Sequence, residues 1–205
     1  MTVAALSPTI RDVIWAYSGL GVAGQVLVGF LLLVGLLRLA GLRGPLETVA
    51  GWVWGYELWG AFVVAALATG GSLFYSEIAG FIPCEFCWYQ RICMYPLSIL
   101  VLVLAWHGDN RAARYLLPLP VVGAGVSIYH MLIAYGAITE PPGCFISAPG
   151  AGCGTNWIKP ESFGYLTIPT VALTGFLLII GFLLLASFGA AEEPDAATLA
   201  AHAER

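Results

Sequence analysis

Apolar residues along this chain gather in five long runs separated by short polar segments. The runs are Val13–Leu37, Glu57–Tyr75, Trp88–Trp106, Tyr115–Ile138 and Ile168–Phe188. Each is close to the length of about 20 residues that a helix needs to cross the hydrocarbon core of a membrane. The runs lack the alternation of barrel strands, and a bilayer offers no water to unpaired backbone groups. The pattern therefore predicts five transmembrane helices.

The composition agrees with an all-α integral membrane protein, because 60% of the 205 residues are hydrophobic and only 10% are charged. Soluble domains contain about 25% charged residues. The first run is too long for the apolar region of a signal peptide, so we expect it to be retained. Trp52 and Trp54 favour the headgroup level. We predict three parts: residues 1–56, an N-terminal transmembrane helix and interfacial segment; 57–188, a four-helix bundle; and 189–205, a cytoplasmic tail.

The basic residues predict the orientation in the plasma (inner) membrane, because Lys and Arg of short loops stay on the cytoplasmic side. One set of segments carries Arg38, Arg43, Arg111, Arg114 and Arg205, and the opposite set carries Arg11 and Lys159. This bias places the N-terminus and both cysteine-bearing loops outside the cytoplasm and the C-terminus inside it. The net charge of −4 indicates no particular partner, and we predict no nucleic-acid binding.

Four of the five cysteines lie in the two loops predicted to be outside. Cys84 and Cys87 stand just before the third run, and Cys144 and Cys153 lie between the fourth and fifth runs. Outside the cytoplasm, paired cysteines are expected to form disulfides at least part of the time. The two-residue spacer of Cys84 and Cys87 closes a very small ring, which removes little chain entropy. This pair therefore favours reversible redox chemistry over a purely structural role.

The residues around the first pair favour a reactive thiolate, whose pKa falls near a helix N-terminus or a cation. Pro83 disfavours helical geometry just before the motif, so the cysteines should lie at the positive end of a helix dipole. Arg91 follows Cys87 by four residues and should lie one turn along the same face. We therefore predict a stabilised thiolate at Cys87. Arg91 also has a simpler interpretation, as a side chain that snorkels to the interface.

Three further features have competing interpretations. Two cysteine pairs can make a tetrahedral zinc site, but Cys144 and Cys153 are more widely spaced than usual zinc ligands, and we predict no metal. Cys93, within the third run, is expected to be a small buried hydrophobe. His130 is ionisable at membrane depth, so it either accepts or relays a proton or is satisfied by a neighbouring helix. The residues leave both interpretations of His130 open.

The segments Pro83–Ile92 and Met94–Leu97 resemble the signature of the DsbB/BdbC family of quinone-linked, disulfide-generating membrane proteins. Tyr129-His130, the second cysteine pair and Leu166-Thr167-Ile168-Pro169 are also similar to that family. The resemblance covers about Glu57–Phe188. Family members typically have four spans, whereas this chain adds a fifth at the front, and Gln90 stands where some relatives carry an acidic residue.

The resemblance implies a thiol:quinone oxidoreductase that reoxidises a secreted, DsbA-like thioredoxin-fold protein and reduces ubiquinone or menaquinone. Cys144 and Cys153 would form the disulfide that this partner attacks, at Cys144. Cys153 would then attack Cys84. Cys87 would lie nearest the quinone ring, Arg91 would contact a quinone oxygen, and His130 would belong to the same quinone site.

Two alternatives to this function remain. The chain could be a non-catalytic membrane scaffold whose loops are held by two permanent disulfides. It could also run the same relay in reverse, as a reductase of extracellular disulfides that draws electrons from quinol. Spacing does not distinguish the direction, because reduction potentials depend on the environment of the cysteines.

Overall fold

The computed structural model describes residues 7–41, 44, 51, 55–142, 144, 152–158 and 163–192. Every regular element within those residues is helical, which confirms the all-α prediction. The elements are α1 (Pro8–Leu39), α3 (Glu57–Leu73), the π-helix η2 (Phe74–Ile78), α4 (Glu85–His107), α5 (Ala113–Leu116), α6 (Pro118–Ala134) and α7 (Ile168–Glu192). The predicted interfacial residues Trp52 and Trp54, and the basic residues Arg43, Lys159 and Arg205, lie outside the described residues.

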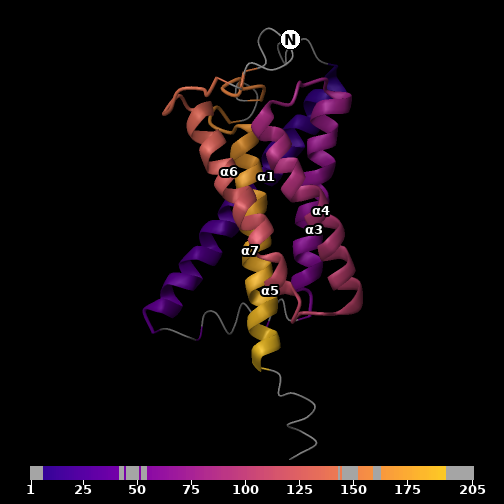
Figure 1. Cartoon of the computed structure of the whole chain (residues 1–205), viewed down its shortest axis with the longest axis vertical. Helices are drawn as coiled ribbons and strands as arrows, with labels where there is room; N and C mark the ends of the chain where they lie inside the picture. The colour runs from indigo at the N-terminus through magenta and orange to yellow at the C-terminus, as the bar shows by residue number, and fades with distance from the viewer. Residues whose placement is uncertain are drawn as a thin grey trace, which may run out of the picture.

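Helices α3, α4, α6 and α7 form a closed four-helix bundle. Helix α3 packs against α4 and α7, and α6 packs against the same two helices, so each member has two neighbours in the ring. Helix α1 packs against α7 from outside the ring. Figure 1 shows that α1 runs obliquely to the bundle and that its C-terminal end leans away from the other helices. The arrangement matches the predicted four-helix bundle with one additional N-terminal helix.

Five helical segments are long and apolar enough to cross a membrane: Pro8–Leu37, Glu57–Ile78, Glu85–His107, Ala113–Ala134 and Ile168–Ser187. Each overlaps one of the five predicted spans. The fourth span ends at Ala134 and not at Ile138, because Gly136 follows with a positive φ of 74° that a helix does not allow. Helix α7 continues to Glu192, so the boundary predicted after residue 188 falls inside a helix.

The bundle core consists of apolar side chains from all four ring helices. Leu97 and Val101 of α4 meet Phe176 and Ile179 of α7, and all four are fully buried. A side chain at Gly123 would collide with the Phe176 ring. The lack of a side chain at Gly123 therefore lets α6 approach α7 closely, as small residues do between membrane helices.

Loops cover one end of the bundle. Phe81, in the segment between η2 and α4, stacks on Tyr75 with ring centroids 5.8 Å apart and on Trp157 with centroids 5.1 Å apart. Trp157 belongs to the loop between α6 and α7. These contacts hold the two cysteine-bearing loops together at the same end of the bundle, shown at the top of Figure 1.

Candidate functional site

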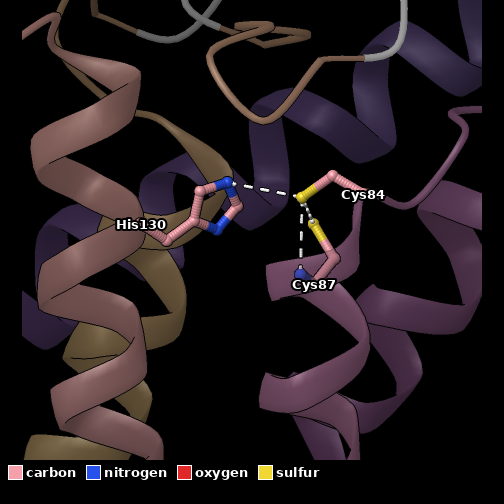
Figure 2. A group of neighbouring side chains, drawn as sticks. All are labelled: Cys84, Cys87 and His130. Atoms are coloured by element: carbon pink, nitrogen blue, oxygen red, sulfur yellow. Dashed lines mark hydrogen bonds between the residues drawn. The ribbon is translucent and has the colours of Figure 1, made fainter. Parts of the chain in front are cut away.

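Cys84 caps the N-terminus of α4. Its backbone is extended, at φ −74° and ψ 174°, as expected for a residue after Pro83 that begins a helix. The backbone N–H of Cys87 donates to Cys84 Sγ over 3.4 Å, and the two sulfur atoms lie 3.1 Å apart. Figure 2 shows both contacts, with His130 approaching from the opposite side. Helix α4 thus begins three residues earlier than the predicted span.

His130 connects the first cysteine pair to the second. Its Nε2 atom lies 3.5 Å from Cys84 Sγ and 3.0 Å from the backbone oxygen of Cys153. Its Nδ1 atom lies 3.4 Å from Gln90 Nε2. The amide can only donate to Nδ1, so Nε2 carries the proton and donates toward Cys84 and Cys153. His130 is therefore satisfied by its neighbours and also contacts a thiol, and its role in accepting or relaying a proton stays a prediction.

The surroundings of Cys84 favour its thiolate. The hydrogen bond from the Cys87 thiol lowers the pKa of Cys84 most strongly and the bond from His130 lowers it further, although burial opposes them; together they bring it from 9.0 to about 4. The sequence predicts a thiolate at Cys87, and this prediction is wrong because the favoured thiolate is that of Cys84. Counting four residues to Arg91 favoured Cys87, whereas the free N–H group at the helix start points at the sulfur of the capping residue, Cys84.

This pKa predicts that reduced Cys84 stays reactive in mild acid. In a Cys93→Ser background, we expect the rate of Cys84 alkylation by iodoacetamide to change little between about pH 8 and about pH 5.5, because the thiolate stays populated above its pKa. The rate should fall as the pH approaches 4. Mass spectrometry of the labelled peptide gives the rate at this residue. Cys87→Ala removes the main donor and should move the fall toward neutral pH; a fall above pH 7 in the parent protein would contradict the assignment.

Arg91 is buried and bonded across the bundle, so it does not snorkel to the interface. Its Nε donates to Ser72 Oγ over 2.9 Å, and one terminal nitrogen, Nη2, donates to the Ser72 backbone oxygen over 3.0 Å. The guanidinium carbon also lies 5.1 Å from the centre of the Trp88 ring, within the range of a cation–π contact. The other terminal nitrogen, Nη1, has no hydrogen bond within the described part of the chain. These contacts fix a buried cation on α4 against α3.

Cys144 and Cys153 form a disulfide with a Cα–Cα distance of 5.5 Å. Both are almost fully buried and cluster with Cys84 and Ile133. While they are joined in this disulfide, the two sulfur atoms are not available as zinc ligands. One ligand atom from each of Cys84, Cys87 and His130 lies within 4.8 Å of the others, so these three side chains could hold a metal ion. The thiol contact and the adjacent disulfide fit redox exchange better.

A cavity beside the first cysteine pair brings the site together. Its empty volume is about 1000 Å³, including space that opens to the outside. Five of the six predicted site residues line it: Cys84, Cys87, Arg91, His130 and Cys153. Cys144 reaches the site through its disulfide with Cys153.

Three residues of the site were not anticipated in these roles. Gln90 orients His130, Ser72 holds Arg91, and Tyr17 of α1 lines the cavity. Ser72 offered a signal, because a polar residue within an apolar span suggests a partner for a membrane-embedded arginine. Gln90 follows Cys87 by three residues and so shares its helical face. Tyr17 looks like any interfacial aromatic residue, and no local pattern distinguishes it.

Comparison with known proteins finds relatives for the segment that carries the four-helix bundle. Residues 57–186 match the model of the family described as "Disulfide bond formation protein DsbB". "Disulfide bond formation protein C" of Bacillus subtilis (strain 168) is 43% identical over 134 residues, which are 62% of this chain and 90% of that protein. A "Probable disulfide formation protein" of Deinococcus radiodurans is 39% identical over 132 residues, 62% of this chain and 86% of that protein. The protein of the same printed name from Coxiella burnetii is 36% identical over 138 residues, 65% of this chain and 88% of that protein. No solved structure matches the chain.

Proposed function

Since this chain belongs to the DsbB family of disulfide bond formation proteins and is a disulfide-generating, multi-pass membrane oxidoreductase, we propose that it reoxidises a thioredoxin-fold partner and reduces a membrane quinone. One observation carries the proposal. The free cysteines Cys84 and Cys87 line a cavity that contains a buried guanidinium, and Cys84 clusters with the buried Cys144–Cys153 disulfide. The first pair is thus close to both an electron donor and a site for an acceptor.

The residues around the cavity fit a quinone such as ubiquinone or menaquinone. A bound quinone supplies a two-electron acceptor that takes up two protons. Its ring and tail are apolar, and Met94, Ala172 and Phe176 give the cavity apolar walls. Its carbonyl oxygens need donors, and Arg91 Nη1 is a donor without a hydrogen bond among the described residues. Arg91 would therefore hold the carbonyl end, with Cys87 on the same wall.

The proposed relay begins at the second cysteine pair. A partner thiolate attacks Cys144 Sγ and breaks the bond to Cys153; the second partner thiol then closes the partner's disulfide and leaves Cys144 and Cys153 reduced. Cys153 attacks Cys84 of an oxidised Cys84–Cys87 pair and releases Cys87. Cys144 then attacks Cys153, re-forms the Cys144–Cys153 disulfide and releases Cys84 as a thiolate. One partner dithiol has by then become a disulfide, and its electron pair resides on Cys84 and Cys87.

The low pKa of Cys84 favours one step of this proposed series of exchange reactions. Thiol exchange is faster when the leaving sulfur has a low pKa, and Cys84 is the leaving group when the Cys144–Cys153 disulfide re-forms. The N–H groups of Cys87 and His130 stabilise that leaving thiolate. His130 contacts both Cys84 Sγ and the Cys153 carbonyl oxygen, so it holds the second pair beside the first.

The orientation belongs to the same proposal. Both cysteine loops lie at one end of the bundle, and we place that end outside the cytoplasm, as the basic residues predict. A secreted partner could then reach the loop that carries Cys144 and Cys153. Five spans put the C-terminus on the cytoplasmic side.

A coupled assay tests the proposed function. Purified protein, given a reduced thioredoxin-fold partner from the same organism and a short-chain quinone, should consume one quinone for every two partner thiols lost. Absorbance of the quinone and titration of the thiols measure the two quantities. Quinone loss without thiol loss, or thiol loss without quinone loss, would refute the coupling.

Two arms of this experiment address the alternatives. Given the oxidised partner, the free Cys144 thiol of Cys153→Ser should attack the partner disulfide and form a mixed disulfide with it, which a scaffold without an exchange site would not form. In cells that lack the protein, the partner should accumulate in its reduced form. Accumulation of the oxidised partner would instead support a reductase.

A further inference from the structure

Helix α1 lies outside the segment that matches the DsbB family, residues 57–186, yet its position against the bundle is closely defined. A side chain at Gly21 would come within 3.0 Å of Leu166, and one at Gly24 within 2.9 Å of Thr174. The two glycines therefore allow close packing of α1 on the segment that contains α7. The hydroxyl of Tyr165 also donates to Gln25 Oε1 over 2.7 Å.

This packing carries Tyr17 to the side of the cavity. The Tyr17 ring stacks on Phe74 with centroids 6.3 Å apart and lies 6.1 Å from the Tyr75 ring. A side chain at Gly71 would come within 2.6 Å of Tyr17 Cε1. Gly71 thus provides the space in α3 that the Tyr17 ring occupies, one residue before Ser72, which holds Arg91.

The cavity therefore has a wall that the family segment does not supply. Tyr17 lines it together with Gly71, Ser72, Cys87 and Arg91. The adjoining Phe74–Ile78 segment is a π-helix, a widened turn that often marks functional sites. If the Tyr17 ring were absent, the cavity would be wider on the α1 side.

We propose that Tyr17 of the additional N-terminal helix is a substrate-binding residue of the quinone pocket, whose ring narrows the cavity against the bound quinone. The proposal rests on the function proposed above. The ring of Tyr17 and not its hydroxyl narrows the cavity, because the ring makes the contacts with Phe74 and Gly71. Helix α1 is then part of the substrate site and does more than anchor the chain.

Steady-state kinetics with a short-chain quinone tests this role. Tyr17→Ala should raise the KM for quinone about tenfold, equivalent to about 1.4 kcal/mol, with kcat within about twofold of the parent. Tyr17→Phe should restore the parent KM. Phe30→Ala serves as the matched control, because Phe30 is an aromatic residue of α1 that is 48% exposed; it should leave KM unchanged.

The outcomes separate this inference from the proposed function and from misfolding. Each variant is first shown to oxidise as many equivalents of partner without quinone as the parent does, which requires folded cysteine sites but no bound quinone. A folded Tyr17→Ala variant with the parent KM, or an equal rise in Phe30→Ala, would overturn the role of Tyr17 alone. A parent protein that reduces no quinone would overturn the proposed function instead.

Discussion

Cys84→Ser should reduce steady-state quinone reduction to the background rate while leaving one equivalent of partner oxidation intact. The Cys144–Cys153 disulfide is present in the structure and can accept one electron pair from the partner. Without the Cys84 sulfur, Cys153 has no acceptor for exchange, so the relay stops after that single event. Rapid alkylation of the partner thiols in the presence of quinone, followed by a gel-shift assay of the partner, should show a burst of oxidised partner equal to the enzyme concentration and no turnover after it.

The matched control for this substitution is Cys93→Ser. Cys93 is a third free cysteine, buried in the bundle core among Leu97 and Ala65, and it contacts none of the relay sulfurs in the described structure. Its replacement should preserve both the burst and the turnover. Continued quinone reduction by Cys84→Ser, or loss of activity in Cys93→Ser, would show that electrons take another route.

Arg91→Met should raise the KM for quinone by about 10- to 100-fold. A hydrogen bond to a charged group contributes about 1.5–3 kcal/mol, and each 1.36 kcal/mol corresponds to about tenfold. The methionine keeps a long apolar side chain in the bundle but removes the charge and every donor. Quinone titration of the steady-state rate measures the effect, and the burst of partner oxidation should be unchanged.

Ser72→Ala distinguishes the charge of Arg91 from its orientation. This substitution keeps the guanidinium but removes the Ser72 hydroxyl that accepts from Nε, while the Ser72 backbone oxygen remains available to Nη2. We expect a smaller rise in KM than for Arg91→Met, about tenfold or less. If Arg91→Met bound quinone as tightly as the parent, Arg91 would not hold the carbonyl end.

The sequence predicts the membrane helices well, because each needs a long apolar run and the bilayer imposes that length. Where a helix ends also depends on local backbone geometry, which the apolar runs do not show. The fourth helix stops at Ala134 because the backbone turns at Gly136, although apolar residues continue to Ile138. The π-helix at Phe74–Ile78 has no signature in hydrophobicity, since a widened turn depends on what packs around it.

The candidate site was predictable in its residues and less so in its geometry. The cysteine motif, Arg91 and His130 are conspicuous as chemical groups at membrane depth, and the structure brings them together. Which sulfur receives the helix N–H depends on the residue at which the helix begins. The spacing of four residues to Arg91 assigned the thiolate to Cys87, whereas the backbone N–H of Cys87 points at the sulfur of Cys84, which caps the helix. The position of Tyr17 at the cavity depends on how α1 packs against the four-helix bundle. The hydrophobic pattern around Tyr17 does not reveal that packing.

The cation and the thiolate of this cavity also make its net charge depend on its redox state. Arg91 and the Cys84 thiolate are opposite charges on one cavity wall, and no carboxylate lines that cavity among the described residues. With the pair reduced, the two charges cancel; once Cys84 and Cys87 join in a disulfide, only the positive charge remains. Each turn of the proposed relay would therefore change the electrostatic potential of the pocket, and anionic ligands would be attracted most when the pair is oxidised.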